Sequence, residues 1–254
     1  MSTTPWDYIA KLVCIGDSGC GKSSLTIRLC EGRFSPHHDV TIGVEFGSRI
    51  VPVGPPHSKV ATLNSSDPDN KGQEADGLPE PPRDDSNMPQ KHMKLSLWDT
   101  AGQETYKSVT RSYFRGASGA LLVFDLSRKQ TFQHVTDWLN DLRQIAEPDI
   151  VVILVGNKAD LTQQEDNKRE VTREEAEEWA KRNGVMEYVE TSAKSGENVE
   201  KAFMRVAERI YNNIQAGKYD LNDRRSGVKG AGAGGNRQVK LSGDANKSAG
   251  GSCC

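Results

Sequence analysis

A glycine-rich loop between a predicted strand and a predicted helix constrains the fold of this chain most. The apolar segment Tyr8–Ile15 predicts a strand, and the segment Lys22–Cys30 predicts a helix. The residues that join them, Gly16–Ser23, fit the spacing G-x-x-x-x-G-K-[ST]. Glycines let such a loop wrap an anion, so that backbone N–H groups and the helix N-terminus point at it. The combination favours a phosphate-binding loop over an ordinary glycine turn.

Strand and helix patterns alternate along the rest of the chain. The continuous apolar runs Ala120–Asp125 and Ile150–Val155 are typical of strands covered on both faces. Two further strands are predicted over Val40–Val51 and Met93–Trp98, as antiparallel neighbours. Apolar residues recur at helical spacing in two stripes, Phe132, Val135, Trp138, Leu139, Leu142 and Ile145, then Val199, Ala202, Phe203, Val206, Ile210 and Ile214. Thr172 with Glu175 forms a capping box for another helix. The alternation predicts an α/β fold with a mostly parallel sheet.

Two polar segments are expected to lie outside the core. The 37-residue stretch Gly54–Gln90 holds seven of the eleven prolines, no aromatic residue and a net charge of −4, which favours a disordered insertion. The last 37 residues, 218–254, hold eight glycines and are expected to form a flexible tether. Residues 7–217, apart from the stretch Gly54–Gln90, have the length of one domain.

Composition excludes several classes of protein. A net charge of −2 argues against a globally basic nucleic-acid binder. The longest apolar run has six residues, whereas a membrane-spanning helix needs about 20. The five cysteines include no CxxC pair, so no zinc site is expected. The odd cysteine number and the absence of a secretory stretch favour a reducing cytosol.

Two motifs later in the chain predict a site that binds guanine. Asn157–Asp160 matches N-K-x-D after an apolar strand, and Ser192–Lys194 matches S-A-K. The Asp160 carboxylate can accept both N1–H and N2–H₂ of guanine, whereas adenine would leave it unpaired. The Ala193 N–H is expected to bind guanine O6. The stem of Lys158 is expected to cover the base, and Asn157 to tie this loop to the phosphate loop.

A third motif, Asp99–Glu104 at the end of a strand, predicts the chemistry of the γ-phosphate. Asp99 is expected to hold Mg²⁺ through water, Gly102 to touch the γ-phosphate, and Gln103 to orient the attacking water. Two hydroxyls, from Ser23 and Thr41, are the expected direct Mg²⁺ ligands, and Lys22 is expected to bridge the β- and γ-phosphates.

Further segments read Ile42-Gly43-Val44-Glu45-Phe46, Lys94-Leu95-Ser96-Leu97-Trp98, Tyr113-Phe114-Arg115-Gly116-Ala117 and Leu122-Val123-Phe124-Asp125. With the three motifs, they make the chain resemble a Ras-superfamily small GTPase, and specifically a Rab. The runs Thr41–Arg49, Ser108–Ser112 and Gly196–Glu200 are most similar to the Rab-four-like subgroup, whose siblings are Rab-two and Rab-fourteen. The resemblance implies a P-loop GTPase domain: a six-stranded sheet with one antiparallel strand and helices on both faces.

The resemblance also implies a set of site residues. Phe34 would place an aromatic edge on guanine, and Phe46, Trp98 and Tyr113 would form an effector surface, the alternative being that these three are core aromatics. The expected nucleotide contacts are Gly16, Asp17, Ser18, Gly19, Cys20, Gly21, Lys22, Ser23, Ser24, Phe34, Thr41, Gly102, Asn157, Lys158, Asp160, Ser192, Ala193 and Lys194. Gln103 is the expected catalytic residue.

The resemblance extends to the end of the chain and to its partners. Cys253 and Cys254 would each carry a geranylgeranyl group and anchor the protein to a membrane, the alternative being an unmodified, solvated tail. The expected partners are an exchange factor, a GTPase-activating protein, a GDP-dissociation inhibitor, a Rab escort protein with its prenyl transferase, and effectors, but no nucleic acid. A monomer on the cytoplasmic face of endosomal or Golgi membranes, cycling with the cytosol, is expected.

The expected activity is slow, stimulated GTP hydrolysis by a switch in vesicular traffic, with Mg²⁺ as cofactor and GTP or GDP as ligand. A P-loop phosphotransferase is an alternative, but no segment supplies an acceptor site or a lid. A nucleotide-locked scaffold without turnover is another, and the intact Gln103 argues against it.

Overall fold

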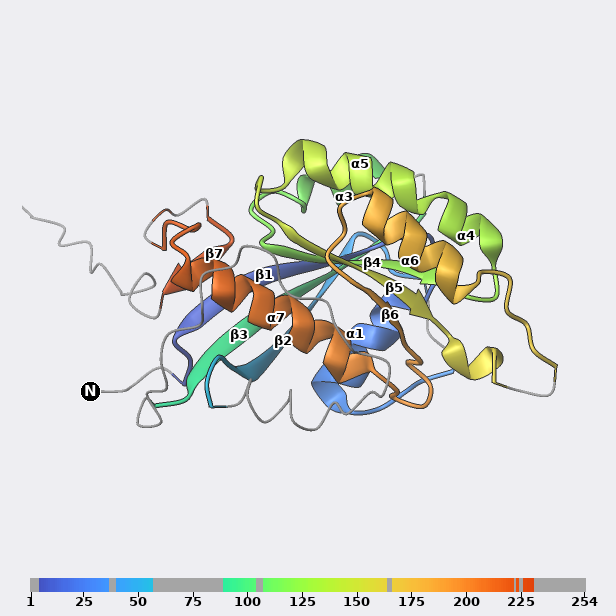
Figure 1. Ribbon diagram of the computed structural model, residues 1–254, viewed down its shortest axis with the longest axis horizontal. Coiled ribbons are helices and arrows are strands. Elements are labelled where there is room, and N and C mark those ends of the chain that lie inside the picture. The colour runs from blue at the N-terminus through green and yellow to red at the C-terminus, as the bar shows by residue number, and fades with distance from the viewer. Residues whose placement is uncertain are drawn as a thin grey trace, which may run out of the picture.

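The protein forms a central sheet with helices on both faces (Figure 1). The computed structural model describes residues 5–36, 40–56, 89–103, 107–163, 166–221, 223 and 226–230. The strands are β1 Tyr8–Ile15, β2 Val44–Val53, β3 Lys91–Thr100, β4 Gly119–Asp125, β5 Val151–Asn157, β6 Tyr188–Glu190 and β7 Val228–Gly230. The helices are α1 Lys22–Glu31, α3 Lys107–Ser112, α4 Lys129–Gln133, α5 Val135–Ile145, the 3₁₀ turn η2 Ala159–Leu161, α6 Arg173–Arg182 and α7 Val199–Gln215.

The sheet has the order β2-β3-β1-β4-β5-β6, with β7 joined to β1. On the six-strand path every neighbouring pair is parallel except β2 and β3, which are antiparallel. The predicted α/β fold is confirmed, with a mostly parallel sheet and one antiparallel strand on this six-strand path. The sheet has a seventh strand, the antiparallel β7, which was not predicted. Every residue of β4 and β5 is buried, because helices cover both faces of these central strands.

The two faces of the sheet carry separate apolar cores. On one face α1 and α7 pack on a core that includes Leu25, Phe203 and Ile210. On the other face α5 and α6 pack on a core that includes Phe124 and Leu139. Figure 1 shows α7 and α1 below the sheet and α5 and α4 above it. None of the described helices combines the length and the apolar character that crossing a membrane requires.

Local boundaries differ from the predicted ones where a turn intervenes. The predicted strand from Val40 begins only at Val44, because Gly43 has φ +80° and starts the strand after a loop. The apolar stripe after Ser127 forms two helices, α4 and α5, that meet at His134. The capping box is confirmed at α6, where the Thr172 hydroxyl accepts the Glu175 N–H at 3.2 Å.

The predicted insertion leaves the sheet at the end of the β2–β3 hairpin, here called the root (Gly54 and Gln90). Strands β2 and β3 pair from Val44 opposite Thr100 to Val53 opposite Lys91, so the predicted antiparallel hairpin is confirmed. The Gly54 N–H donates to both carboxylate oxygens of Glu208 on α7, at 3.1 and 3.2 Å. Residues 57–88, most of the predicted disordered stretch, lie outside the described residues.

The prediction that a tether begins at Lys218 is wrong for the segment around β7. Strand β7 pairs antiparallel with Tyr8–Ala10 of β1, and Val228 is fully buried. Since β4 starts opposite Leu12, the first half of β1 has a free edge on that side, and β7 fills it. Residues 231–254, which include the predicted lipid sites Cys253 and Cys254, lie outside the described residues.

Candidate functional site

A cavity of about 470 Å³ opens at the edge of the sheet where the parallel strands end. In an α/β sheet the carboxyl ends of parallel strands are the usual place for a ligand. Predicted nucleotide contacts that line it are Ser18, Gly19, Gly21, Lys22, Ser23, Ser24, Phe34, Thr41, Gly102, Asn157, Lys158, Asp160, Ala193 and Lys194. The predicted contacts Gly16, Asp17, Cys20 and Ser192 do not line it. The cavity is also lined by five residues that no sequence motif indicated as contacts: Ser35, Pro36, Val40, Thr100 and Leu161.

The phosphate loop, Gly16–Ser23, is shaped by close backbone approaches. A Cβ at Gly16 would lie 2.0 Å from the Val123 carbonyl oxygen, and one at Gly21 would lie 2.3 Å from Asn157 Nδ2. Both glycines have positive φ values. Among the described residues no side chain caps the N-terminus of α1, so its first N–H groups are available to an anion.

Lys22 is held inside this loop. Its Nζ donates to the carbonyl oxygens of Gly16 and Asp17, both at 2.9 Å, and its side chain is buried. Burial lowers the pKa of Lys22, while the thiol of Cys20 and the carboxylate of Asp99 oppose this shift. An anionic phosphate in the cavity would stabilise the charged form of the lysine further.

Three oxygen-bearing side chains predicted as Mg²⁺ ligands lie together. Ser23 Oγ and Thr41 Oγ1 are 2.9 Å apart, and Thr41 Oγ1 donates to Asp99 Oδ2 at 3.4 Å. Asp99 Oδ1 is buried and has no hydrogen-bond partner within the described structure. Burial raises the pKa of Asp99, with hydrogen bonds from Ser23 and Thr41 and the charge of Lys22 opposing the shift. An orphaned carboxylate oxygen beside two hydroxyls fits the oxygen-rich shell that Mg²⁺ requires.

The loop after β3 lies against the phosphate loop. The Ser18 N–H donates to the Gly102 carbonyl oxygen at 3.0 Å, and a Cβ at Gly102 would lie 2.5 Å from the backbone nitrogen of Ser18 and 2.6 Å from the backbone carbonyl carbon of Asp17. Only glycine can therefore occupy this position. Gln103 follows directly but does not line the cavity, and residues 104–106 lie outside the described residues.

At the other end of the cavity, Asp160 and Asn157 are held by the loop after β6. Ser192 Oγ donates to Asp160 Oδ1 at 2.6 Å and so fixes the carboxylate. Asn157 Nδ2 donates to the Cys20 carbonyl oxygen at 2.8 Å. The expected tie between this loop and the phosphate loop is thus present.

The backbone around Ala193 is held by two neighbours. Its N–H, the expected donor to guanine O6, donates to Asn157 Oδ1 at 3.2 Å in the structure, and its contact with guanine stays a prediction. The Ala193 carbonyl oxygen is also engaged, since it accepts from Arg28 Nε at 2.9 Å. Arg28, on α1, is a supporting residue that no motif indicated.

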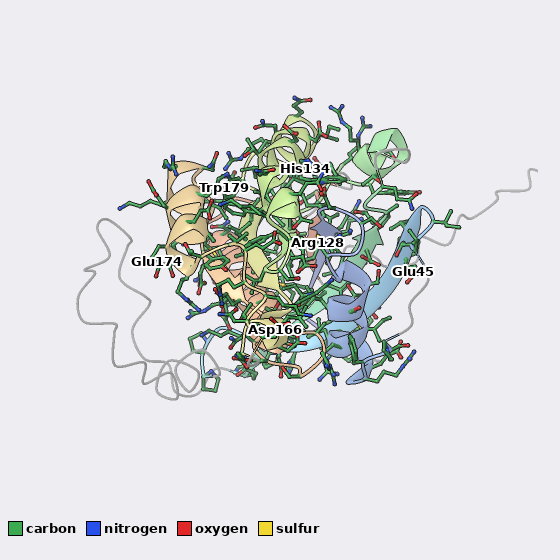
Figure 2. The ribbon with its side chains drawn as sticks, turned by 90° about the vertical axis from the view of Figure 1, so that its right-hand side faces the viewer. Glu45, Arg128, His134, Asp166, Glu174 and Trp179 are labelled. Atoms are coloured by element: carbon green, nitrogen blue, oxygen red, sulfur yellow. The ribbon has the colours of Figure 1, made fainter. Side chains whose placement is uncertain are left out.

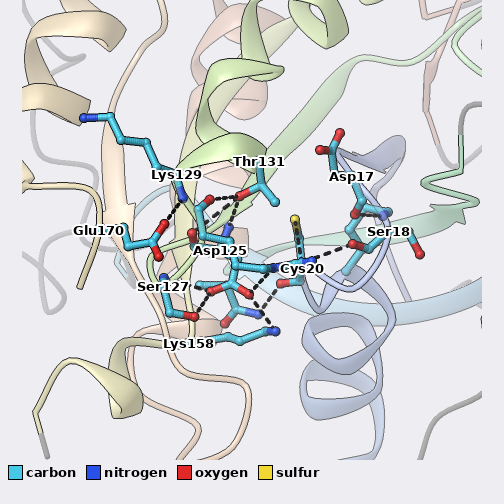
Figure 3. Close-up of polar contacts among 12 residues, drawn as sticks. Asp17, Ser18, Cys20, Asp125, Ser127, Lys129, Thr131, Lys158 and Glu170 are labelled. Atoms are coloured by element: carbon cyan, nitrogen blue, oxygen red, sulfur yellow. Dashed lines mark hydrogen bonds and ion pairs between the residues drawn. The ribbon is translucent and has the colours of Figure 1, made fainter. Parts of the chain in front are cut away.

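A second supporting group, around Asp125 at the end of β4, was also missed (Figure 3). Lys158 Nζ lies 2.7 Å from Asp125 Oδ2, and Arg128 Nε donates to the same oxygen at 3.0 Å. Burial would raise the pKa of Asp125, but the hydrogen bonds from Lys158 and Ser127 outweigh it and lower the pKa. The one available signal was an acidic residue that ends an apolar strand at the ligand edge.

The side chain of Asp17 points away from the cavity. Its two oxygens lie 2.6 Å from His134 Nδ1 and 2.8 Å from Trp138 Nε1. Arg128, at the other end of α4, donates to the Ser18 carbonyl oxygen at 3.1 Å. Figure 2 labels Arg128 near the centre of that view and His134 above it. The Asp17 side chain therefore links the phosphate loop to the α4–α5 junction.

The three predicted effector residues form one cluster, here called the aromatic surface (Phe46, Trp98 and Tyr113). The Phe46 and Trp98 rings meet edge to face with centroids 4.6 Å apart, and those of Trp98 and Tyr113 are 5.8 Å apart. Phe46 is 66% exposed, which rules out a core role for it. Ile42, in the loop that carries Thr41, is 78% exposed beside the same strand.

Comparison with protein families agrees with this geometry. Residues 11–75 and 80–212 match the model of a family described as the Ras family. The match includes the phosphate loop, the loop after β3 and both loops around Asp160.

Proposed function

The chain belongs to the Ras family, and from this premise we propose that it is a Rab-type switch that binds GTP or GDP. The main observation in support is that the phosphate loop and Asp160 line the same cavity. One end of the cavity offers uncapped N–H groups and a buried lysine, and the other offers an oriented carboxylate. A ligand that satisfies both ends has a polyphosphate and a base with two adjacent donors, which describes a guanine nucleotide.

Each group at the site has a distinct task in this proposal. Lys22 and the N-terminus of α1 bind the phosphates, while Asp160 accepts the two donors of guanine. Ser23 and Thr41 would hold Mg²⁺, with Asp99 reaching it through water. The ion, when bound, neutralises charge that develops on the phosphates. Gln103 orients the attacking water from the loop that Gly102 holds against the phosphate loop.

Hydrolysis in such a switch is slow and needs a partner. For Ras, the intrinsic rate is about 3–5 × 10⁻⁴ s⁻¹, and an activating protein raises it about 10⁵-fold. The output is therefore binding: the GTP-bound form recruits effectors through the aromatic surface, and the GDP-bound form releases them. The direct connection of the Thr41 loop to β2, which carries Phe46, supports this proposal.

We assign the switch to vesicular traffic, in endosomal recycling or a Golgi-linked route, on the Rab-like segments of the sequence. Two geranylgeranyl groups on Cys253 and Cys254 would anchor it to the cytoplasmic face of the membrane, since two lipid chains give stable attachment. The exchange factor, GTPase-activating protein, GDP-dissociation inhibitor, and Rab escort protein with its prenyl transferase are the partners of that cycle.

Single-turnover hydrolysis of bound GTP, with and without a Rab-directed activating protein, tests the proposal. A switch shows a slow rate that the partner stimulates, and Gln103→Leu lowers the intrinsic rate. A nucleotide-locked scaffold shows no turnover in either condition. A phosphotransferase transfers the γ-phosphate to an added small acceptor instead of water.

The membrane role has its own experiment. A tagged full chain is localised against endosomal and Golgi markers beside the Cys253→Ser, Cys254→Ser double variant. The proposal expects organelle labelling for the wild type and cytosolic signal with intact GTP binding for the variant. Continued membrane sedimentation of the variant would show that the lipid anchor is assigned wrongly.

A further inference from the structure

Lys11 lies beneath the aromatic surface on the neighbouring strand. Its Nζ is 3.8 Å from the centroid of the Trp98 ring and donates to the Arg115 carbonyl oxygen at 2.9 Å. The side chain is half-buried, and within the described part of the chain no carboxylate pairs with it. The ammonium group is therefore held by one ring and one carbonyl oxygen.

This environment makes the ring contact significant. Burial lowers the pKa of Lys11 to about 8, because desolvation disfavours the charged ammonium group. The ammonium group still carries its charge near pH 7, in a site where water solvates it poorly. A cation against an aromatic ring is attracted more strongly when it is partly desolvated.

The backbone of Lys11 is fixed from both sides. Its N–H donates to the Gly227 carbonyl oxygen at 2.9 Å, beside β7, and its carbonyl oxygen accepts the Ser118 N–H at 3.0 Å. A Cβ at Gly227 would lie 1.7 Å from the Gly116 carbonyl oxygen, so these two segments are in close contact. These hydrogen bonds fix the backbone of Lys11, so its ammonium group has a defined position under the Trp98 ring.

Trp98 is the central ring of the aromatic surface, because it contacts both Phe46 and Tyr113. We propose that Lys11 is a positioning residue for this surface: its charge fixes the plane of the Trp98 ring and thereby the arrangement of all three rings. That the surface recruits effectors rests on the proposed function, whereas the positioning itself is a property of the chain alone.

The chain offers a matched control for this pair. Lys94 Nζ lies 4.7 Å from the centroid of the Trp6 ring, so it forms a second lysine–tryptophan contact on β3. Neither ring contact of Trp98 involves Trp6. Removing the charge of Lys94 should therefore leave Trp98 unaffected.

The test uses the full chain, GDP-loaded and labelled with 5-fluorotryptophan, in ¹⁹F NMR spectra from pH 6 to pH 10. The Trp98 resonance is assigned with Trp98→Phe. In the wild type it should shift with a midpoint near the Lys11 pKa of about 8, as the ammonium group loses its proton. Lys11→Met should abolish this titration, Lys11→Arg should keep the cation throughout the range, and Lys94→Met should titrate like the wild type.

The other titratable groups on Lys11's own strand and on the elements around it are Tyr8 and Cys14 on β1, Lys91, His92, Lys94 and Asp99 on β3, Asp125 on β4, Arg115 before β4, and Lys229 on β7. All these groups are present in the wild type and in both Lys11 variants. They therefore cannot cause a difference in the Trp98 titration between these proteins. Bound GDP and the circular dichroism spectrum verify that each variant is folded. Cross-relaxation between the Phe46 and Trp98 rings should be lost in Lys11→Met and restored in Lys11→Arg.

An unchanged Trp98 titration in Lys11→Met would overturn the proposal, as would an equal effect of Lys94→Met. Neither readout involves an effector. A failure of the proposed traffic function would therefore leave these results intact, and a failure of the positioning would leave the traffic function intact.

Discussion

Asn157 Nδ2 donates to the Cys20 carbonyl oxygen over 2.8 Å and so joins the end of β5 to the phosphate loop. The Oδ1 atom of the same buried side chain accepts from Thr191 Oγ1 and from the Ala193 N–H, each at 3.2 Å. One amide group therefore connects three loops of the cavity. The base end and the phosphate end of the site depend on each other through it.

Asn157→Ala should weaken both the fold and the binding of nucleotide. The change leaves the Cys20 carbonyl oxygen and the Ala193 N–H without partners, at a cost of about 1–3 kcal/mol in the free energy of unfolding. Release of a fluorescent GDP analogue should accelerate about tenfold or more. Asn183→Ala is the control, because Asn183 Nδ2 bonds to the Trp179 carbonyl oxygen away from the cavity. Equal GDP release from wild type and Asn157→Ala would contradict the linking role.

Ser23→Asn should weaken the binding of GTP more than the binding of GDP when Mg²⁺ is limiting. The Ser23 hydroxyl lies 2.9 Å from Thr41 Oγ1, and the two hydroxyls would hold an Mg²⁺ ion that neutralises the additional phosphate charge of GTP. Affinities are measured by titration at several Mg²⁺ concentrations. Chelation of Mg²⁺ should lower the wild-type affinity to that of the variant. A difference between the two proteins that persists after chelation would point to a steric effect instead.

Shortening the insertion should stabilise the domain and leave nucleotide binding unchanged. The root contacts α7 through Gly54 and Glu208, away from the cavity, so residues 55–89 can be replaced by Asn-Gly while Gly54 and Gln90 stay. Reducing a loop from about 40 to about 5 residues removes three doublings of length, or about 2 kcal/mol of closure cost. Urea unfolding measures the gain. GTP and GDP affinities that changed more than a few-fold would show that the insertion influences the site.

Arg169→Met should destabilise the protein near neutral pH but much less in acid. Arg169 donates to both oxygens of Glu190, at 2.9 and 2.8 Å, just before the loop that holds Asp160. Burial raises the pKa of Glu190, but the hydrogen bonds from Arg169 and Tyr188 outweigh it, and the pKa lies below the ordinary 4.5.

A depressed carboxyl pKa contributes stability above the ordinary pKa, and this stability is lost as the pH falls through the lower pKa of the folded state. The variant should therefore lose about 2 kcal/mol at pH 7, and the gap to the wild type should narrow below pH 4.5. Urea unfolding at several pH values tests this, with the neighbouring, exposed Lys168→Met as control. A gap that stayed constant with pH would contradict the ion-pair account.

The sequence predicted the parts of the site that local pattern encodes. Gly16–Ser23 and Asn157–Asp160 have fixed spacings because the backbone must fold around one ligand, so they could be recognised without a structure. Strand β7 could not be predicted in this way. Its three residues form a strand only because β4 leaves an edge of β1 free beside Tyr8. The contact between Asp125 and Lys158 likewise joins two strands that are adjacent only in space.

Guanine selectivity at Asp160 is tested most directly by comparing the binding of guanine and xanthine nucleotides. Wild type and Asp160→Asn are titrated with fluorescent GDP and XDP under one set of conditions. An amide cannot accept both guanine donors but can donate to O2 of xanthine, so GDP affinity should fall about 100-fold or more while XDP affinity rises. Unchanged GDP affinity in Asp160→Asn would contradict the assignment of this cavity to guanine nucleotides.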